Sequence, residues 1–384
     1  MKKNIKLMLP ILTPICFSPL VAASCNHDDV EELFLPKNFQ IVKIEDNKLA
    51  ELKSKVNNLK LNGNEFLHST TFKIDDNEKD YFLKAYVIST PNIEATTKVD
   101  SEKDTIYPIS IEIQYWIIKK DHSGENEHQL VANSEKVVNI NFQNFTLHSL
   151  NSIYNKFDAQ KAFEYKNINW DILKNKYFDA EITDWSDGDT FKATVIGKDN
   201  ANNMVEIGEE IKVRIDGIDT PEKAVNGKVS QDFEMGYAKL SSRFAIDTIP
   251  VGSKVRVIGD TKDSFGRIVG DAFFGDKYQY LYTLEIVRAG LTLPYAKLNN
   301  VINKIKNPIY LEHYSIHQMA LAFNDAIKNR RGFFKTFALP EWASKCIYRQ
   351  KPNTSWTDFW KRSRKNFFNA TGLDLVNDSY KNKN

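Results

Sequence analysis

The chain has 384 residues, of which 42% are hydrophobic and 12% aromatic, so it can bury one large core or two ordinary ones, and we expect two domains. The formal net charge of +2 conceals an uneven distribution, because residues 26–180 and 181–296 carry −6 and −5 whereas residues 297–384 carry +10. All ten arginines lie at or after Arg214, which excludes arginine-based recognition of phosphate from the first half of the chain.

The first 25 residues have the layout of a secretory signal. Lysines precede an apolar stretch from Leu7 to Ala23, which three prolines interrupt, and small residues end it in "VAASC". The stretch is too short and too rich in proline for a membrane span. The small residues before Cys25 resemble the lipobox of bacterial lipoproteins. This resemblance implies a signal peptide at 1–24, lipidation of Cys25 and an outward-facing protein anchored in the cell membrane; an ordinary cleaved signal with an incidental cysteine is the alternative.

Cysteine use agrees with export. If Cys16 leaves with the signal and Cys25 is acylated, Cys346 is the cysteine that remains. No intramolecular disulfide is then available, so the folded domains must be stable through their cores alone.

The first half of the exported chain predicts a small α+β domain. Residues 25–36 are acidic, lack a core pattern and are expected to form a tether. Within 37–150, "NKLAELKSKVNNLK" has a helical stripe, and strand patterns follow in "YFLKAYVIST", "YPISIEIQYWIIKK" and "KVVNINFQNF". The histidines here are scattered without metal-ligand spacing, which favours solvated or structural roles. Residues 151–180 predict a helical or irregular connector.

From residue 181 the pattern changes to alternating strands and helices. "FKATVIG" and "EIKVRIDGI" predict paired strands joined by a polar turn. Helical patterns follow in "QDFEMGYAKLSSRFAID", in "YLYTLEIVRAG", which ends at Gly290, and in "SIHQMALAFNDAIKNRRG", which ends at Gly332. Strands that form a small barrel, interrupted by one helix and followed by others, are typical of an OB-like fold, which is frequent among nucleic-acid binders.

Three short stretches in this half contain the candidate chemistry: "SDGDT" at 186–190, "VRIDGIDTPE" at 213–222 and "DSFGR" at 263–267. Each alone predicts little more than a turn or a strand end. Together they resemble the staphylococcal nuclease (thermonuclease) family, which has a D-G-D-T turn, an R-x4-D-T-P-E segment and a D-x-x-G-R segment. The match extends to spacing, because Asp219 follows Arg214 by five residues and Glu222 follows Asp219 by three.

The resemblance implies an α+β domain at 181–335, with a five-stranded OB-fold barrel and about three helices. It also implies a hydrolase of the thermonuclease type, a calcium-dependent endonuclease that cleaves DNA and RNA with low sequence specificity and leaves 3′-phosphates.

Residue by residue, the resemblance implies that Asp189 and Asp219 are carboxylate ligands of Ca²⁺ and that the backbone carbonyl of Thr220 completes the protein's share. Calcium is a hard ion that takes six to eight oxygen ligands, so three protein oxygens leave an open site with room for water and a phosphate oxygen.

The other implied roles concern the reaction itself. Glu222 corresponds to the residue that orients or deprotonates the attacking water. Arg214 and Arg267 correspond to the arginines that clamp the scissile phosphate, and their planar forks bind more strongly as charge develops on phosphorus.

Two departures from the family pattern concern nucleotide contacts. Ser264 and Phe265 stand where the family commonly has a Lys and a Tyr that touch the nucleotide's terminal phosphate, which implies that this contact is lost or altered. Tyr295 stands near a family tyrosine that packs on the base, offset by about one residue. Base stacking and simple burial are the two interpretations of Tyr295.

The remaining residues, 336–384, form a basic and aromatic extension. "NTSWTDFWKRSRKNFF" predicts a helix with an aromatic stripe and a basic face. One hypothesis is that the stripe docks the helix on the protein and the basic face is solvated. The other is that the basic face gathers polynucleotide or an anionic bilayer surface.

Two further hypotheses compete with the enzyme. One is a non-catalytic nucleic-acid-binding OB-fold lipoprotein, which loss of the carboxylates or arginines would favour; all five catalytic side chains are present. The other is a surface adhesin in which residues 26–180 contact a host.

The lipid anchor predicts the mass of the mature protein. Mass spectrometry of the N-terminal peptide is expected to find Cys25 as the first residue, carrying acyl chains. An unmodified N-terminus at or after position 25 would contradict the anchor and support an ordinary cleaved signal.

Overall fold

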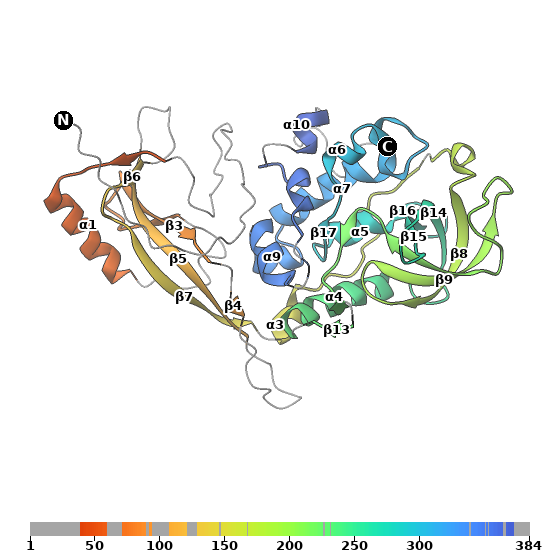
Figure 1. The fold of residues 1–384 in the computed structure, drawn as a ribbon, viewed down its shortest axis with the longest axis horizontal. Coiled ribbons are helices and arrows are strands. Elements are labelled where there is room, and N and C mark those ends of the chain that lie inside the picture. Colours follow the sequence, from red (N-terminus) through yellow and green to blue (C-terminus); the bar gives the residue numbers. More distant parts are fainter. Residues whose placement is uncertain are drawn as a thin grey trace.

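The computed structural model contains a sheet-rich N-terminal region followed by a barrel with helices (Figure 1). It describes residues 39–59, 71–89, 92–93, 107–120, 129–145, 147–166, 168–225, 227–230, 232–337, 339–349, 351, 353–363 and 366–371. The predicted signal peptide, the lipidation site at Cys25 and the tether lie outside these residues. Among the helices that are described, none is both long enough and apolar enough to cross a bilayer.

A seven-stranded sheet forms the N-terminal region. Its strands are β1 (Ile41–Val42), β2 (Thr71–Lys73), β3 (Tyr81–Val87), β4 (Asn92–Ile93), β5 (Tyr107–Lys119), β6 (Gln129–Val131) and β7 (Lys136–Phe145). The long strand β5 is central, because β3, β4, β6 and β7 all pair with it. Helix α1 (Asp46–Asn58) covers one face through Leu52, which is fully buried. The predicted sheet-rich α+β region is therefore present.

The connector is tied to the second half of the chain by specific contacts. It begins within α3 (Leu147–Ile153) and contains the 3-10 helix η1 (Trp170–Leu173). Tyr154 donates to Asp247 Oδ2 at 2.6 Å, and the buried amide of Phe163 donates to Glu285 Oε1 at 3.2 Å. The first barrel strand begins at Tyr177, inside the stretch that the sequence assigns to the connector.

Five strands close into a barrel: β8 (Tyr177–Trp185), β9 (Thr190–Lys198), β10 (Glu210–Ile215), β14 (Lys254–Lys262) and β15 (Ile268–Phe274). They follow the order β10-β9-β8-β14-β15, and β10 closes the ring by pairing in parallel with β15. The predicted pairing of β9 with β10 and the five-stranded OB-fold barrel are confirmed. Apolar residues of β10 alternate into the core, since Ile211, Val213 and Ile215 are buried.

The three predicted helices of the second half are α4 (Asp232–Thr248), α5 (Tyr282–Arg288) and α7 (Leu311–Lys328). The shorter elements are β11 (Ile218–Asp219), β12 (Ala224–Val225), β13 (Lys228–Val229), β16 (Tyr280–Leu281), β17 (Leu293–Pro294), α6 (Leu298–Val301), η2 (Lys304–Lys306), α8 (Phe333–Thr336) and α9 (Pro340–Ile347). Gly290 and Gly332 follow α5 and α7 with positive φ, and their turns touch, so a Cβ on Gly332 would lie 2.3 Å from Gly290 O.

The prediction of one continuous helix near the C-terminus is wrong. The segment forms two short pieces, η3 (Ser355–Phe359) and α10 (Phe367–Thr371). The side chain of Asn324 explains the break, because it donates to Phe359 O at 2.7 Å and accepts from the amide of Lys361 at 3.0 Å. The aromatic stripe does dock on the protein, since Trp356 and Phe367 are buried with their neighbours.

One barrel residue is a buried carboxyl. Asp271 on β15 is fully buried, and its Oδ1 accepts from the amide of Ala272 at 2.7 Å. Its Oδ2 finds no hydrogen-bond partner in the part of the chain that the structure describes. Burial raises the pKa of Asp271 from its ordinary value of 3.8 to about 8, so the group is held protonated in the barrel at neutral pH.

This carboxyl gives a pH-dependent stability. The folded protein keeps the Asp271 proton up to about pH 8 while the unfolded chain releases it near 3.8, so the residue's contribution to the free energy of unfolding falls as pH rises between those values. The substitution Asp271→Asn removes that ionisation. Urea unfolding across this pH range is expected to show the variant gaining stability relative to wild type as pH rises; a difference independent of pH would contradict a protonated Asp271.

Candidate active site

Strand pairing brings the three sequence motifs to one part of the barrel. In β10, Arg214 lies opposite Thr190 of β9 and beside Val269 of β15. Thr190 directly follows Asp189, and Val269 comes two residues after Arg267. The first three residues of "VRIDGIDTPE" are the end of β10. Because β10 pairs with both β9 and β15, "SDGDT" and "DSFGR" lie on either side of this motif.

Asp189 is fixed by the segment that follows β11. It is 1% exposed, and its Oδ2 accepts from the amide of Thr220 at 2.9 Å and from the Thr220 hydroxyl at 2.8 Å. The preceding Gly188 is required by space, because a Cβ there would lie 2.7 Å from Ser241 Cβ and 2.9 Å from the Thr220 methyl. The glycine of the D-G-D-T turn thus lets two loops approach closely enough for this hydrogen bonding.

Arg214 connects the two buried aspartates. Its Nη1 forms an ion pair with Asp189 Oδ1, and its Nη2 lies 3.0 Å from Asp219 Oδ1. Both carboxylates are 1% exposed. A buried carboxylate is costly without a paired cation, so the guanidinium stabilises both at once. The structure therefore brings together three of the residues that the resemblance singles out.

Glu222 lies in the turn after these residues and is half-buried. Its backbone carbonyl accepts from the Ser230 hydroxyl at 2.5 Å, and its amide donates to Glu234 Oε1 at 3.4 Å. Burial, and then the charge of Asp187, raise the pKa of Glu222 above its ordinary value. A carboxylate with a raised pKa is a stronger base than a solvated one.

Asp187 is a residue that the sequence analysis did not assign. Burial raises its pKa as well, and its charge is close enough to raise that of Glu222. The ammonium of Lys223 donates to the carbonyl of Ser186 at 2.9 Å, which places a positive charge at this turn. The place of Asp187 as the first aspartate of the D-G-D-T turn was the available signal, and this residue is half-buried and close enough to the candidate base to affect its pKa.

Arg267 is held separately from the other four candidate side chains. Its Nε and Nη2 both lie 2.8 Å from Asp263 Oδ2, and its guanidinium lies 5.3 Å from the centre of the Phe265 ring. Phe265 is 80% exposed. The arginine is thus positioned by its own hairpin, with an exposed aromatic ring beside it.

The C-terminal extension reaches the same site, which the sequence did not predict. The hydroxyl of Tyr348 donates to the carbonyl of Asp219 at 2.7 Å. Lys351 Nζ lies 3.2 Å from Asp219 Oδ1 and 5.0 Å from the centre of the Tyr295 ring. Tyr295 is 44% exposed, which is incompatible with the interpretation of this side chain as a buried aromatic. No motif marked Tyr348 or Lys351, because their role depends on a contact across more than a hundred residues.

The donors that the resemblance assigns to calcium are oxygen atoms of two carboxylates and one carbonyl. Within the described residues, no group of three or more His, Cys, Asp or Glu side chains is arranged to hold a metal ion. The carboxylates of Asp189 and Asp219 nevertheless converge on one guanidinium, so the space between them already favours a positive charge. Two hard carboxylates and the Thr220 carbonyl are oxygen ligands of the kind Ca²⁺ takes, with the remaining places for water and substrate.

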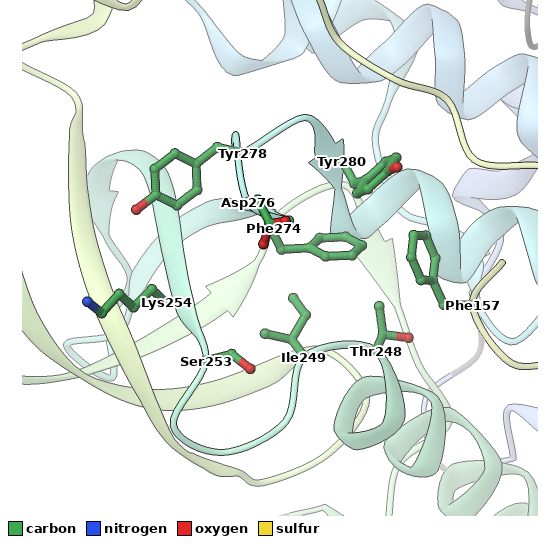
Figure 2. A pocket seen from close by; sticks show the side chains of 10 residues that line it. Phe157, Thr248, Ile249, Ser253, Lys254, Phe274, Asp276, Tyr278 and Tyr280 are labelled. Atoms are coloured by element: carbon green, nitrogen blue, oxygen red, sulfur yellow. The ribbon is translucent and has the colours of Figure 1, made fainter. Parts of the chain in front are cut away.

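A pocket of about 520 Å³ lies elsewhere on the barrel (Figure 2). It is formed by the loop after α4, the turn between β15 and β16, and Phe157 of the connector. The rings of Phe157, Phe274 and Tyr280 gather on one side of it, and Lys254 lies on another (Figure 2). These residues are separate from Asp189, Asp219 and the other residues of the candidate site, so the pocket is a different feature.

Comparison with known proteins finds a family match within the second half of the chain. Residues 212–322 match the family model described as staphylococcal nuclease homologue. Residues 212–322 are a staphylococcal nuclease-like domain. The matched range contains Arg214, Asp219, Glu222 and Arg267, whereas Asp189 precedes it on a strand that completes the same barrel.

Two single proteins are also similar. An uncharacterized lipoprotein of Mycoplasma genitalium is 29% identical over 206 residues, which cover 51% of this chain and 76% of that protein. The extended Tudor domain of Drosophila melanogaster Tudor-SN aligns with 64% of this chain and 99% of its own, at 10% identity and a TM-score of 0.23. A score this low supports no argument about fold.

The docking of the extension predicts a loss of stability in Tyr348→Phe. The substitution removes the hydrogen bond to Asp219 O and leaves the buried amide of Leu293, now bonded to the hydroxyl at 3.1 Å, without its acceptor. An unpaired buried amide costs about 1–3 kcal/mol, so urea unfolding is expected to show a decrease of that size. The control is Tyr314→Phe, whose hydroxyl bonds Pro308 O at an exposed position; an equal loss in both variants would contradict the prediction.

Proposed function

We propose that this protein is a surface-anchored, calcium-dependent nuclease that hydrolyses phosphodiester bonds of DNA and RNA with low sequence specificity. The observation that supports it is the pair of buried aspartates held by Arg214, beside the half-buried Glu222, at the end of the barrel. The match of residues 212–322 to a nuclease family adds to this support.

In this proposal Asp189, Asp219 and the Thr220 carbonyl hold Ca²⁺, which supplies Lewis-acid polarisation of the phosphoryl oxygens. Glu222 orients the attacking water and accepts its proton. Its raised pKa suits that task, because the base strength of a carboxylate rises with its pKa.

Arg214 and Arg267 bind the scissile phosphate. Both now contact carboxylates, Arg214 with the aspartates and Arg267 with Asp263, so each guanidinium is held in place before substrate arrives. A phosphate that enters the site competes for these donors, and the arginines stabilise the charge that develops as water attacks in line and the 5′-oxygen leaves.

The exported location belongs to the same proposal. Lipidation of Cys25 would leave residues 25–36 as a tether, 37–150 as an accessory domain and 181–335 as the nuclease domain, with 336–384 as an extension. The similar Mycoplasma genitalium protein is described as a lipoprotein, which supports the anchor. A surface site is also exposed to extracellular calcium, so a weak calcium site would suffice.

A plasmid-digestion assay tests the enzyme. The wild-type protein is expected to cleave plasmid DNA with calcium and to stop when a chelator is added. Glu222→Gln is expected to lower kcat by about 10²–10⁴-fold, since general-base assistance contributes on this scale. Arg267→Ala is expected to lower it by about 10²–10³-fold through lost stabilisation of the transition state.

The matched control is Glu210→Gln, which changes an exposed glutamate of β10. It is expected to cleave like wild type. Folding of each variant is checked by its urea unfolding curve. If the wild-type protein binds DNA but does not cleave it under calcium, the enzyme is rejected and the non-catalytic nucleic-acid-binding lipoprotein is favoured. If it neither cleaves nor binds DNA, the adhesin is favoured.

A further inference from the structure

Lys351 brings a second cation to the candidate site from outside the matched family region. Its Nζ lies 3.2 Å from Asp219 Oδ1, the same oxygen that Arg214 Nη2 contacts at 3.0 Å. Arg214 comes from the barrel, whereas Lys351 follows α9 in the C-terminal extension. One buried carboxylate oxygen therefore has two positively charged neighbours.

The backbone around Lys351 is anchored on both sides. Before it, Tyr348 bonds the carbonyl of Asp219, and the amide of Arg349 donates to Glu234 Oε2 at 3.2 Å. After it, the fully buried Asn353 donates to the carbonyl of Pro294 at 3.3 Å and accepts at its own carbonyl from the Ser344 hydroxyl at 2.5 Å. Lys351 lies between these anchored residues, and its side chain reaches Asp219.

Neutralising Asp219 does not by itself account for Lys351. Arg214, whose side chain is 15% exposed, already pairs with this carboxylate. The Lys351 side chain is 44% exposed, so its ammonium also faces solvent. An ammonium has three donors, and contact with a single carboxylate oxygen leaves donors that a solvent-borne ligand can use.

The neighbouring aromatic ring indicates the class of ligand. Lys351 Nζ lies 5.0 Å from the centre of the Tyr295 ring, and Tyr295 is 44% exposed. An accessible cation over a partly exposed aromatic ring matches a nucleotide, which has a phosphate and a flat base within a few ångströms of each other. The amide of Tyr295 donates to Gly217 O at 2.7 Å, so the ring is mounted on the same loop as Asp219.

We propose that Lys351 extends the substrate site by a subsite beside Asp219: Lys351 binds a phosphate of single-stranded nucleic acid next to Tyr295, whose packing on a base the family resemblance already implies. This inference rests on the proposed nuclease function in one respect: if Asp219 belongs to the active site, the phosphate bound by Lys351 is a neighbour of the scissile phosphate. The C-terminal extension is then part of the substrate site.

Binding of a labelled single-stranded hexadeoxynucleotide to the full chain tests the subsite. Fluorescence anisotropy is measured in chelator, where no cleavage occurs, over a series of salt concentrations. Lys351→Gln is expected to raise Kd by about fivefold to tenfold and to reduce the slope of log Kd against log salt by about 0.7, the value for one phosphate contact on a single strand. Tyr295→Ala is expected to raise Kd by about fivefold or more through lost stacking.

Two further variants make the result specific. Lys361→Gln removes an exposed positive charge of the same extension and is expected to change Kd by less than about twofold. Lys351→Arg keeps the charge and is expected to restore binding. A loss with Lys361→Gln equal to that with Lys351→Gln would show general attraction to a basic surface and overturn the subsite.

The outcomes separate this inference from the proposed function. If wild type cleaves plasmid under calcium and Lys351→Gln binds oligonucleotide as wild type does, the subsite is overturned and the nuclease stands. If wild type does not cleave but Lys351→Gln weakens binding with the reduced salt slope, the subsite stands without the nuclease. If Lys351→Gln leaves oligonucleotide binding unchanged and cleaves faster at limiting calcium, Lys351 competes with the metal for Asp219, and the subsite is likewise overturned.

Discussion

The ion pairs of Arg214 with Asp189 and Asp219 are the interaction on which the candidate site depends. The two carboxylates come from segments thirty residues apart and are almost fully buried. Two negative charges in such a place repel each other and lose hydration, so their proximity requires a cation between them. The guanidinium supplies it, and the calcium ion of the proposed function would meet the same demand for positive charge.

The barrel holds that interaction in place. Parallel pairing of β10 with β15 closes the ring, and the alternation along β10 buries Val213 and Ile215 while Arg214 reaches the carboxylates. Close approach of the loops then depends on small residues. A side chain at Gly188 would collide with Ser241 and Thr220, and the bonds from Thr220 to the aspartate would be lost.

The C-terminal extension changes how the charge distribution of the chain is understood. Its excess of positive charge appeared as a separate basic tail, yet part of that charge lies against the acidic loops of the barrel. Buried aromatic residues dock the extension on the protein, and the Tyr348 hydroxyl donates a hydrogen bond to the carbonyl of Asp219. The extension and the nuclease-like domain thus share one site, although the family match ends at residue 322.

The sequence by itself determined the barrel strands and the main helices, because alternation, helical spacing and turn residues are local patterns. The grouping of the carboxylates with Arg214 was implied by the resemblance of three motifs to one family, and the structure brings these three side chains together. It did not determine the break between η3 and α10, since the side chain of Asn324 competes for backbone groups that a continuous helix would use. Nor did it indicate Lys351, whose significance comes from Asp219 and Tyr295. Only the tertiary structure decided these contacts, because they join residues that are far apart in the chain, and no local sequence pattern around either partner predicts the other.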